Sequence, residues 1–359
     1  MKWSLHRGLQ VLLFLVLVFL ILVYAKPFLV PVTFGALLAM LFLPLSRRME
    51  AGTNRAVANL LCILILVLVF AGLAALLSWQ ISDIASDADK IEKEMRSKME
   101  QASTGIAERL GIPQEQQQEF IQKQRSSTDV GGKVMTGLSS AGALLTDMVL
   151  ILVYLFLFLY FRDRLRKFVL KLVPDQNQQA ANKVMTDSRK VAEKYLAGLA
   201  MMIVCLWILY GIGFTIVGVK NALFFAMLCG LLEIVPFIGN IIGTTITVFM
   251  VLAQGGSGGM VIGVLATYAI VQSFQSYVLE PLVVGSNVNI NPLFTILVLV
   301  FGEFVWGLPG MVLAIPVLGI IKIICDHVRP LHPIGYLIGE DKKSSSTKKW
   351  IQKIKGKFS

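Results

Sequence analysis

The sequence predicts an all-α polytopic membrane protein with about eight transmembrane helices. Hydrophobic residues make up 56% of the 359-residue chain, charged residues make up only 15%, and the mean hydropathy is +0.73. So much apolar surface cannot be hidden in one water-soluble core of this size. Apolar runs of about 20 residues, the length that crosses the hydrocarbon layer, recur along the chain. The run over 223–325 is interrupted by prolines and glycines, so we expect interrupted helices or re-entrant hairpins in the C-terminal third.

The predicted spans follow the apolar runs in chain order. They cover residues 9–25, 28–45, 57–79, 144–161, 196–219, 223–253, 260–279 and 293–325. The first run also resembles a signal peptide, because Lys2 and Arg7 precede it and Ala25 ends it in a cleavage-like sequence. Pro27 and many further spans follow, so we expect this run to stay as a membrane helix.

Hydrophilic stretches divide the chain into domains. After the helices of 1–79 we expect a water-exposed helical hairpin over 80–143, because apolar residues recur every three or four positions over 81–110. This apolar stripe packs either on its own return helix or on a neighbouring subunit. The remaining domains are a span over 144–161, a basic segment over 162–194, a transmembrane transport core over 195–328 and a basic tail over 329–359.

The distribution of positive charge predicts the orientation of the chain. Most of the 33 Lys and Arg residues fall on one side of the membrane if both termini are cytoplasmic. The runs over 162–167 and 342–357 would also attract anionic lipid headgroups. Membrane lipids are therefore expected partners, whereas nucleic acid is not, despite the net charge of +11.

Several kinds of chemistry lack the residues that they need. Cys62, Cys205, Cys229 and Cys325 lie inside apolar runs without a CxxC spacing, and the three histidines lie at the chain ends. We find no P-loop, nucleophile elbow or metal-ligand spacing. We therefore expect no cofactor, no bound metal and no enzymatic activity, although sites assembled from distant helices can escape a linear reading.

The first candidate for a polar pathway surrounds Glu233. On one helix face, Glu233 would be followed at steps of three and four residues by Pro236, Asn240 and Thr244, with Gly239 beside the break. A charge inside lipid costs at least ~2.5 kcal/mol, so Glu233 needs a partner or a task. The structural alternative is helix packing through Gly239 and hydroxyl groups that bond back to their own helix.

Further polar residues recur in the last two apolar runs. Gln272, Ser276 and Glu280 repeat every fourth residue, and Glu303 interrupts the final run. The other candidates for the substrate or ion pathway are Gln275, Pro281, Asn289 and Asn291. The expected helix breaks are Pro236, Gly302, Gly307, Pro309, Gly310 and Pro316. Interrupted helices of this kind build the central sites of many transporters, although the loop over 285–292 is equally well an exposed connector.

Four ordered motifs carry a resemblance to a known family. They are Leu-Glu-Ile-Val-Pro-Phe-Ile-Gly at 232–239, Glu-Pro-Leu-Val-Val-Gly at 280–285, Asn-Pro-Leu at 291–293, and Phe-Gly-Glu at 301–303 followed by Gly-Leu-Pro-Gly-Met-Val-Leu-Ala-Ile-Pro at 307–316. In these motifs the chain resembles the autoinducer-2 exporter family. One departure is Asn240, where many members have a second proline.

The resemblance implies a bacterial inner-membrane protein with about eight spans that forms homo-oligomers and exports small molecules. Some members are associated with the quorum-sensing signal, and others with exchange of sodium or lithium for protons. The candidate lining suits a sugar-like signal, a nucleobase, a hydrophobic metabolite or a cation alike.

The leading hypothesis is proton-coupled export. Burial disfavours the charged form of a carboxylate, so Glu233 or Glu303 would gain and lose a proton during transport. A sodium or lithium antiporter would instead use Glu233, Asn240 and Thr244 as oxygen ligands. A membrane scaffold that recruits partners through the hairpin and the tail is the alternative outside transport.

Overall fold

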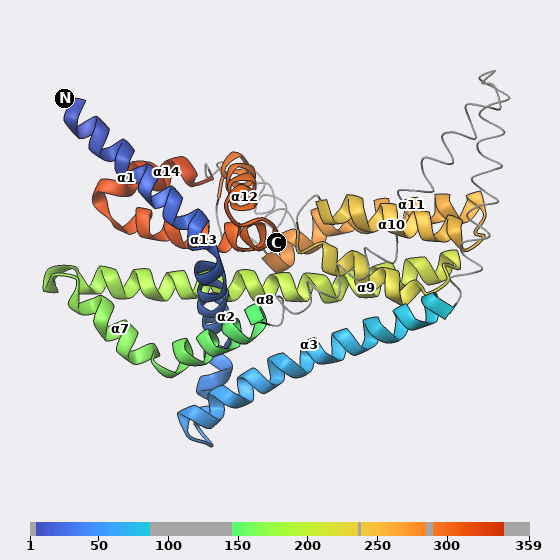
Figure 1. The fold of residues 1–359 in the computed structure, drawn as a ribbon, viewed down its shortest axis with the longest axis horizontal. Helices are drawn as coiled ribbons and strands as arrows, with labels where there is room; N and C mark the ends of the chain where they lie inside the picture. Colours follow the sequence, from blue (N-terminus) through green and yellow to red (C-terminus); the bar gives the residue numbers. More distant parts are fainter. Residues whose placement is uncertain (1–4, 87–145, 236–237, 285–289, 341–359) are drawn as a thin grey trace, which may run out of the picture. The chain divides into compact units, whose positions relative to one another are not determined.

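The computed structural model describes residues 5–86, 146–235, 238–284 and 290–340 (Figure 1). These residues form helices and turns without any strand, apart from an isolated antiparallel bridge between Ile290 and Gly339. The predicted all-α class is therefore confirmed. Within the same residues, five helices are long and apolar enough to cross a membrane, and five shorter helices are also apolar.

The chain forms two compact units. Unit 1 contains Met1–Val30, Asp163–Tyr195 and Ser286–Ser359, and unit 2 contains Pro31–Arg162 and Leu196–Gly285. The predicted hairpin over 80–143 lies outside the described residues beyond Ser86. The predicted tail over 329–359 likewise lies outside them beyond Glu340.

Unit 2 is built from apolar helices. Its elements are α2 (Lys26–Glu50) from Pro31 onward, α3 (Arg55–Ser86), a helix over Thr146–Tyr160, α8 (Gln178–Val217) from Leu196 onward, α9 (Ala222–Leu232), α10 (Ile238–Ala253), α11 (Gly258–Phe274) and a π-helix (Gln275–Val284). Ser257 caps the start of α11 by accepting a hydrogen bond from the Met260 N–H.

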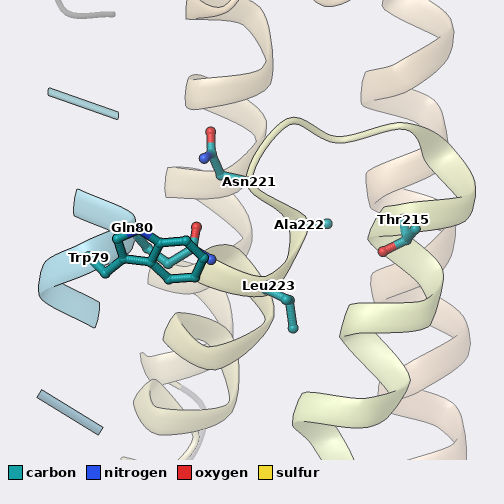
Figure 2. A pocket seen from close by; sticks show the side chains of 6 residues that line it. All are labelled: Trp79, Gln80, Thr215, Asn221, Ala222 and Leu223. Carbon is teal, nitrogen blue, oxygen red and sulfur yellow. The ribbon is translucent and has the colours of Figure 1, made fainter. Parts of the chain in front are cut away.

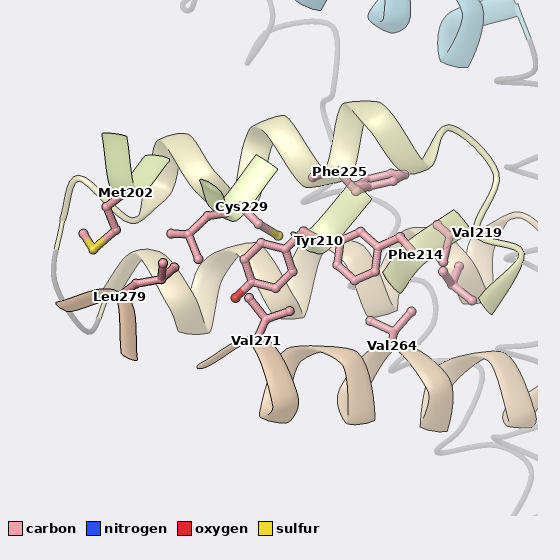
Figure 3. Close-up of a cluster of buried hydrophobic side chains, with 12 residues drawn as sticks. Met202, Tyr210, Phe214, Val219, Phe225, Cys229, Val264, Val271 and Leu279 are labelled. Carbon is pink, nitrogen blue, oxygen red and sulfur yellow. The ribbon is translucent and has the colours of Figure 1, made fainter. Parts of the chain in front are cut away.

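One stripe of α8 organises the core of unit 2. Met202, Leu206, Tyr210 and Phe214 recur every fourth residue, so they lie on one face of the helix, and all four are buried. Figure 3 shows these side chains packed with residues from α9, α10, α11 and the π-helix. The other buried members of this core are Val219, Phe225, Ala226, Cys229, Val251, Val264, Val271 and Leu279.

The predicted span over 223–253 is a pair of antiparallel helices. A Cβ atom on Gly239 would collide with the Leu232 carbonyl, and one on Gly243 would press on Cys229, so α10 runs back along α9 in close contact. The 11 residues of α9 extend about 16 Å, roughly half of the hydrocarbon layer. The α9–α10 pair therefore has the dimensions of a re-entrant hairpin.

In unit 1, a second helical hairpin takes the place of the last predicted span. Its helices are α12 (Pro292–Trp306) and α13 (Leu308–His327), which meet at Gly307. Gly302 and Gly310 pack backbone against backbone, because a Cβ atom on either would collide with the carbonyl group of the other. Gly307 has a positive φ of 70°, which a glycine adopts without strain.

Two expected helix breaks in this segment are wrong. α12 continues through Gly302, and α13 continues through Pro316. Gly302 serves the close approach of the two helices instead of breaking one. Pro309 lies in the first turn of α13, where a missing backbone N–H has no intrahelical partner to lose.

Two further helices of unit 1 pack on this hairpin. α1 (Leu5–Tyr24) contacts α12 through Phe19, whose ring stacks on Phe304, and through the Trp306 indole, which donates to the Leu22 carbonyl at 2.9 Å. α14 (His332–Ile338) packs on α13. The remaining elements are α7 (Arg162–Lys171), counted from Asp163, and the first part of α8.

Candidate functional site

Glu233 lies at the tip of the α9–α10 hairpin. It is the residue directly after α9, its N–H donates to the Cys229 carbonyl, and its side chain is only 6% exposed. Gly239 allows the first turn of α10 to lie against the end of α9. The carboxylate thus follows a helix about 16 Å long, roughly half the thickness of the hydrocarbon layer. Transport sites are typically found near this depth.

Two amide groups hold one oxygen of this carboxylate. Gln275 donates from Nε2 to Glu233 Oε1 at 2.6 Å, and Asn240 donates from Nδ2 to the same oxygen at 3.2 Å. Gln275 is the first residue of the π-helix, directly after the last residue of α11. The helix changes there from the α to the wider π winding. The end of α9, the start of α10 and the start of the π-helix therefore meet at Glu233.

Several buried polar atoms around this site have no hydrogen-bond partner. They are Glu233 Oε2, Gln275 Oε1, Gln272 Oε1 and the Tyr210 hydroxyl. Leaving a buried polar atom unpaired costs about 1–3 kcal/mol, so a group of such atoms in one region marks a candidate site. Three of the four atoms are carboxylate or amide oxygens, which accept hydrogen bonds or coordinate cations as long as the carboxylate is ionised.

Unpaired carboxylate and amide oxygens are groups that can bind a proton or a hard cation. The hydrogen bonds to Glu233 come from amides, and no Lys, Arg or His in the described part of the chain forms an ion pair with it. Protonation would neutralise the carboxylate and give Oε2 a hydrogen to donate, whereas a cation would use the same oxygens as ligands. Among the residues that the structure describes, no group of three His, Cys, Asp or Glu could hold a metal ion.

A second polar cluster in unit 2 differs in that its carboxylate is paired with an arginine. Arg162 donates from Nη1 and Nη2 to the two oxygens of Glu50, at 2.8 and 2.5 Å. Ser46 bonds to Asn59 at 2.7 Å and to Glu50 at 3.2 Å, and Arg55 donates to the Tyr160 carbonyl. The cluster joins the end of α2, the start of α3 and the end of the helix over Thr146–Tyr160.

A cavity of about 340 Å³ lies at the other end of α9. Figure 2 shows its lining by Trp79, Gln80, Thr215, Asn221, Ala222 and Leu223. An indole beside amide and hydroxyl groups can contact both polar and apolar parts of a small molecule. The cavity touches the first residues of α9, and Glu233 follows the last one.

The apolar core of unit 2 lies along α9 between the cavity and Glu233. Phe225 and Cys229 are buried on α9 at intermediate positions, and they pack with Phe214 and Val264 (Figure 3). Phe214, Phe225 and Val264 are each at most 1% exposed. The cavity and the carboxylate are therefore separated by close-packed side chains.

The predicted pathway residues do not all gather at Glu233. Asn240 and Gln275 bond to it, and Gly239, Thr244 and Gln272 are buried or half-buried on the neighbouring elements. Ser276 and Glu280 are exposed, although Glu280 is close enough to interact electrostatically with Glu233.

The other predicted pathway residues lie in unit 1 or outside the described residues. Asn291 caps α12 by accepting a hydrogen bond from the Leu293 N–H at 3.0 Å, which is a structural role. Glu303 is exposed on α12. Pro236 and Asn289 lie outside the described residues, as does the side chain of Pro281.

Sequence reasoning missed residues that take part in both clusters. Tyr210 is almost fully buried and is close enough to Glu233 for an electrostatic interaction. Tyr210 is separated from Met202 and Phe214 by multiples of four residues, and this spacing would have placed it on the same buried helix face. Glu50 and Arg162 were treated only as topology signals or left aside, because nothing in their local sequence pairs residues so far apart.

Membrane-length helices with a polar site at a hairpin tip are the construction of a multi-pass membrane transporter. The comparison with protein families agrees: a family model described as AI-2E family transporter matches residues 12–330. The chain therefore belongs to the AI-2E transporter family, and the predicted resemblance is confirmed.

Individual relatives are distant. The chain is 25% identical over 165 residues to "Putative transport protein YrrI" of Bacillus subtilis (strain 168), covering 46% of each chain. It is 26% identical over 195 residues to "Putative transport protein YueF" of the same organism, covering 53% of this chain and 52% of the relative. It is 24% identical over 295 residues to "Putative transport protein YhhT" of Escherichia coli (strain K12), covering 82% of each. The matches span about half the length of the Bacillus relatives and most of YhhT.

Proposed function

We propose that this chain is a proton-coupled exporter of a small organic molecule and that Glu233 carries the proton. The observation that supports this is the one-sided pairing of the Glu233 carboxylate. Oε1 accepts hydrogen bonds from two amides, whereas Oε2 is buried without a partner. A buried oxygen in this setting favours the neutral carboxylic acid over the anion. Proton binding and release would then switch the charge at the hairpin tip in each cycle.

The cavity and the core fit a transport path that is closed in this conformation. A solute in the cavity beside Trp79 would reach Glu233 only if Phe214, Phe225 and Val264 moved apart. Alternating access requires such a barrier on one side of the site while the other side opens. The proposed coupling is that the protonation state of Glu233 changes the packing of the hairpin against α8 and α11.

A sodium or lithium antiporter is a second candidate, and a specific observation favours it. Glu233 Oε2, Gln275 Oε1 and Gln272 Oε1 are all unpaired oxygen atoms. Oxygen donors are the ligands of hard cations. In this version of the proposal, the cation and the proton would compete for the same carboxylate.

The proposal places the protein in the bacterial inner membrane as a homo-oligomer with both termini in the cytoplasm. The positive charge of 47–55 and 162–194 supports this orientation. The contacts of Arg162 with Glu50 and of Arg55 with Tyr160 support placing those two segments on the same side. Cysteine accessibility from each side would test the orientation, and cross-linking in native membranes would test the assembly.

The test of function is proton flux in proteoliposomes that contain the purified protein under an imposed pH gradient. Na⁺, Li⁺, K⁺ or organic solutes are added in turn. Dissipation of the gradient by an organic solute alone supports the exporter, and dissipation by Na⁺ or Li⁺ alone supports the antiporter. Flux that is unchanged in Glu233→Gln under every condition would contradict both versions.

A further inference from the structure

α7 has an exposed apolar face that no described residue covers. Leu165, Phe168 and Val169 of α7 and Leu172, the residue directly after the helix, follow at steps of three, one and three residues, so they lie on one side. Their exposed fractions range from 39% for Val169 to 68% for Leu172. Four exposed apolar side chains on one helix face indicate a surface that is buried against something else.

The opposite side of α7 is basic. The helix carries five basic residues and one acid, and Arg164, Lys167 and Lys171 point away from the apolar face by their helical positions. Arg162 bonds to Glu50, and Arg166 donates to Asn182 Oδ1 at 3.0 Å. For Arg164, Lys167 and Lys171, no bond or ion pair to another described residue is found.

The position of α7 in the chain identifies what covers it. The helix over Thr146–Tyr160 is apolar enough to lie in a membrane, and α7 begins two residues after it. Tyr160 and Phe161 form an aromatic pair at the junction, with ring centroids 5.0 Å apart, and such residues mark the membrane–water boundary. The bond from Arg162 to Glu50 fixes the first residue of α7 at the end of α2. α7 therefore starts where a membrane segment ends.

We propose that α7 is an interfacial helix whose apolar face enters the boundary between acyl chains and headgroups, while Arg164, Lys167 and Lys171 bind the phosphates of anionic phospholipids. Amphipathic helices with this distribution of side chains lie in the plane of the interface. Each basic residue near an anionic leaflet adds to the attraction. This inference concerns unit 1 and does not depend on the transport proposal.

The depth of α7 can be measured on the full chain in nanodiscs. Nitroxide labels at Phe168→Cys and at Lys167→Cys sample the two faces at neighbouring positions. The unsubstituted chain is the control that measures how much label reacts with its four native cysteines. We expect the label at position 168 to be reached by oxygen dissolved in lipid and the label at position 167 by a water-soluble nickel complex. Equal access of the nickel complex to both labels would overturn the proposal. A label at position 168 that neither reagent reaches would also overturn it, because protein would then cover the face.

The headgroup contacts need a separate measurement with matched charge. The variant Lys167→Gln/Lys171→Gln and the control Lys183→Gln/Lys190→Gln remove the same charge, and Lys183 and Lys190 are exposed on α8. In nanodiscs that contain spin-labelled phosphatidylglycerol or phosphatidylcholine, we expect the preference for phosphatidylglycerol to fall at least twofold in the α7 variant only. An equal fall in both variants, or in neither, would overturn binding by α7.

Discussion

Glu233 and Glu50 are two carboxylates of unit 2 that meet opposite surroundings. Glu50 accepts hydrogen bonds from both terminal nitrogens of the Arg162 guanidinium, so its negative charge is matched by a positive one. Glu233 meets only amides, and one of its oxygens has no partner. A charge with a fixed counter-ion is suited to holding helices together. A carboxylate without one is suited to binding and releasing a proton or cation, because the partner must come from solution.

The largest expected effect is the loss of transport in Glu233→Gln. The amide preserves the size of the side chain but cannot release a proton, so we expect pH-driven flux to fall on the order of a hundredfold or more, equivalent to ~2.7 kcal/mol. Flux in proteoliposomes is the measurement, and the protein should still elute as a single folded species. Glu340→Gln is the matched control, because Glu340 is exposed and lies outside the candidate pathway. Equal loss in both variants would contradict a special role for Glu233.

Removing the other carboxylate should affect stability instead of transport. Glu50→Ala leaves the half-buried Arg162 without its counter-ion, so we expect a loss of about 2 kcal/mol in the free energy of unfolding. Thermal unfolding in detergent measures this change, and the flux per folded molecule should stay the same. The double variant Glu50→Ala/Arg162→Ala should lose less than the sum of the single changes. A strictly additive result would show that the ion pair does not hold these helices together.

The hairpin that positions Glu233 can be tested through Gly239. A Cβ atom there would collide with the Leu232 carbonyl, so Gly239→Ala should destabilise the protein by roughly 1–3 kcal/mol. Gly258→Ala is the control, because no atom lies near the position of its added Cβ. Thermal unfolding of the two variants should differ clearly. If both behave as the parent chain does, α10 does not pack against the end of α9 as described.

The smallest expected effect comes from the amide that holds Glu233. Gln275→Leu removes the donor at 2.6 Å from Glu233 Oε1, and the loss of one hydrogen bond to a charged group is worth about 1.5 kcal/mol. We therefore expect flux to fall about tenfold. Ser276→Ala, at the exposed neighbouring position, should keep full flux in the same proteoliposome assay. Unchanged flux in Gln275→Leu would mean that the amide plays no part in the cycle.

Sequence reasoning predicted the class of fold and part of the candidate site. Glu233 and Asn240 were grouped correctly because they lie close in sequence on either side of a predicted helix break, and the structure joins them by a hydrogen bond. Gln275 was predicted only as a pathway residue, since no local pattern links it to Glu233 across 42 positions. Gly302 was misread as a break because a glycine in an apolar run serves either a kink or a close helix contact.

The sequence by itself determined the apolar helical segments and the family. These follow from the number of consecutive apolar residues and from ordered motifs, which are properties of the linear chain. Only the tertiary structure decided which polar groups meet. The pairing of Gln275 with Glu233 and of Arg162 with Glu50 depends on how helices from distant parts of unit 2 rotate and pack against one another. That rotation is set by the fit of many side chains at once, such as the α8 stripe from Met202 to Phe214, and not by any single stretch of sequence.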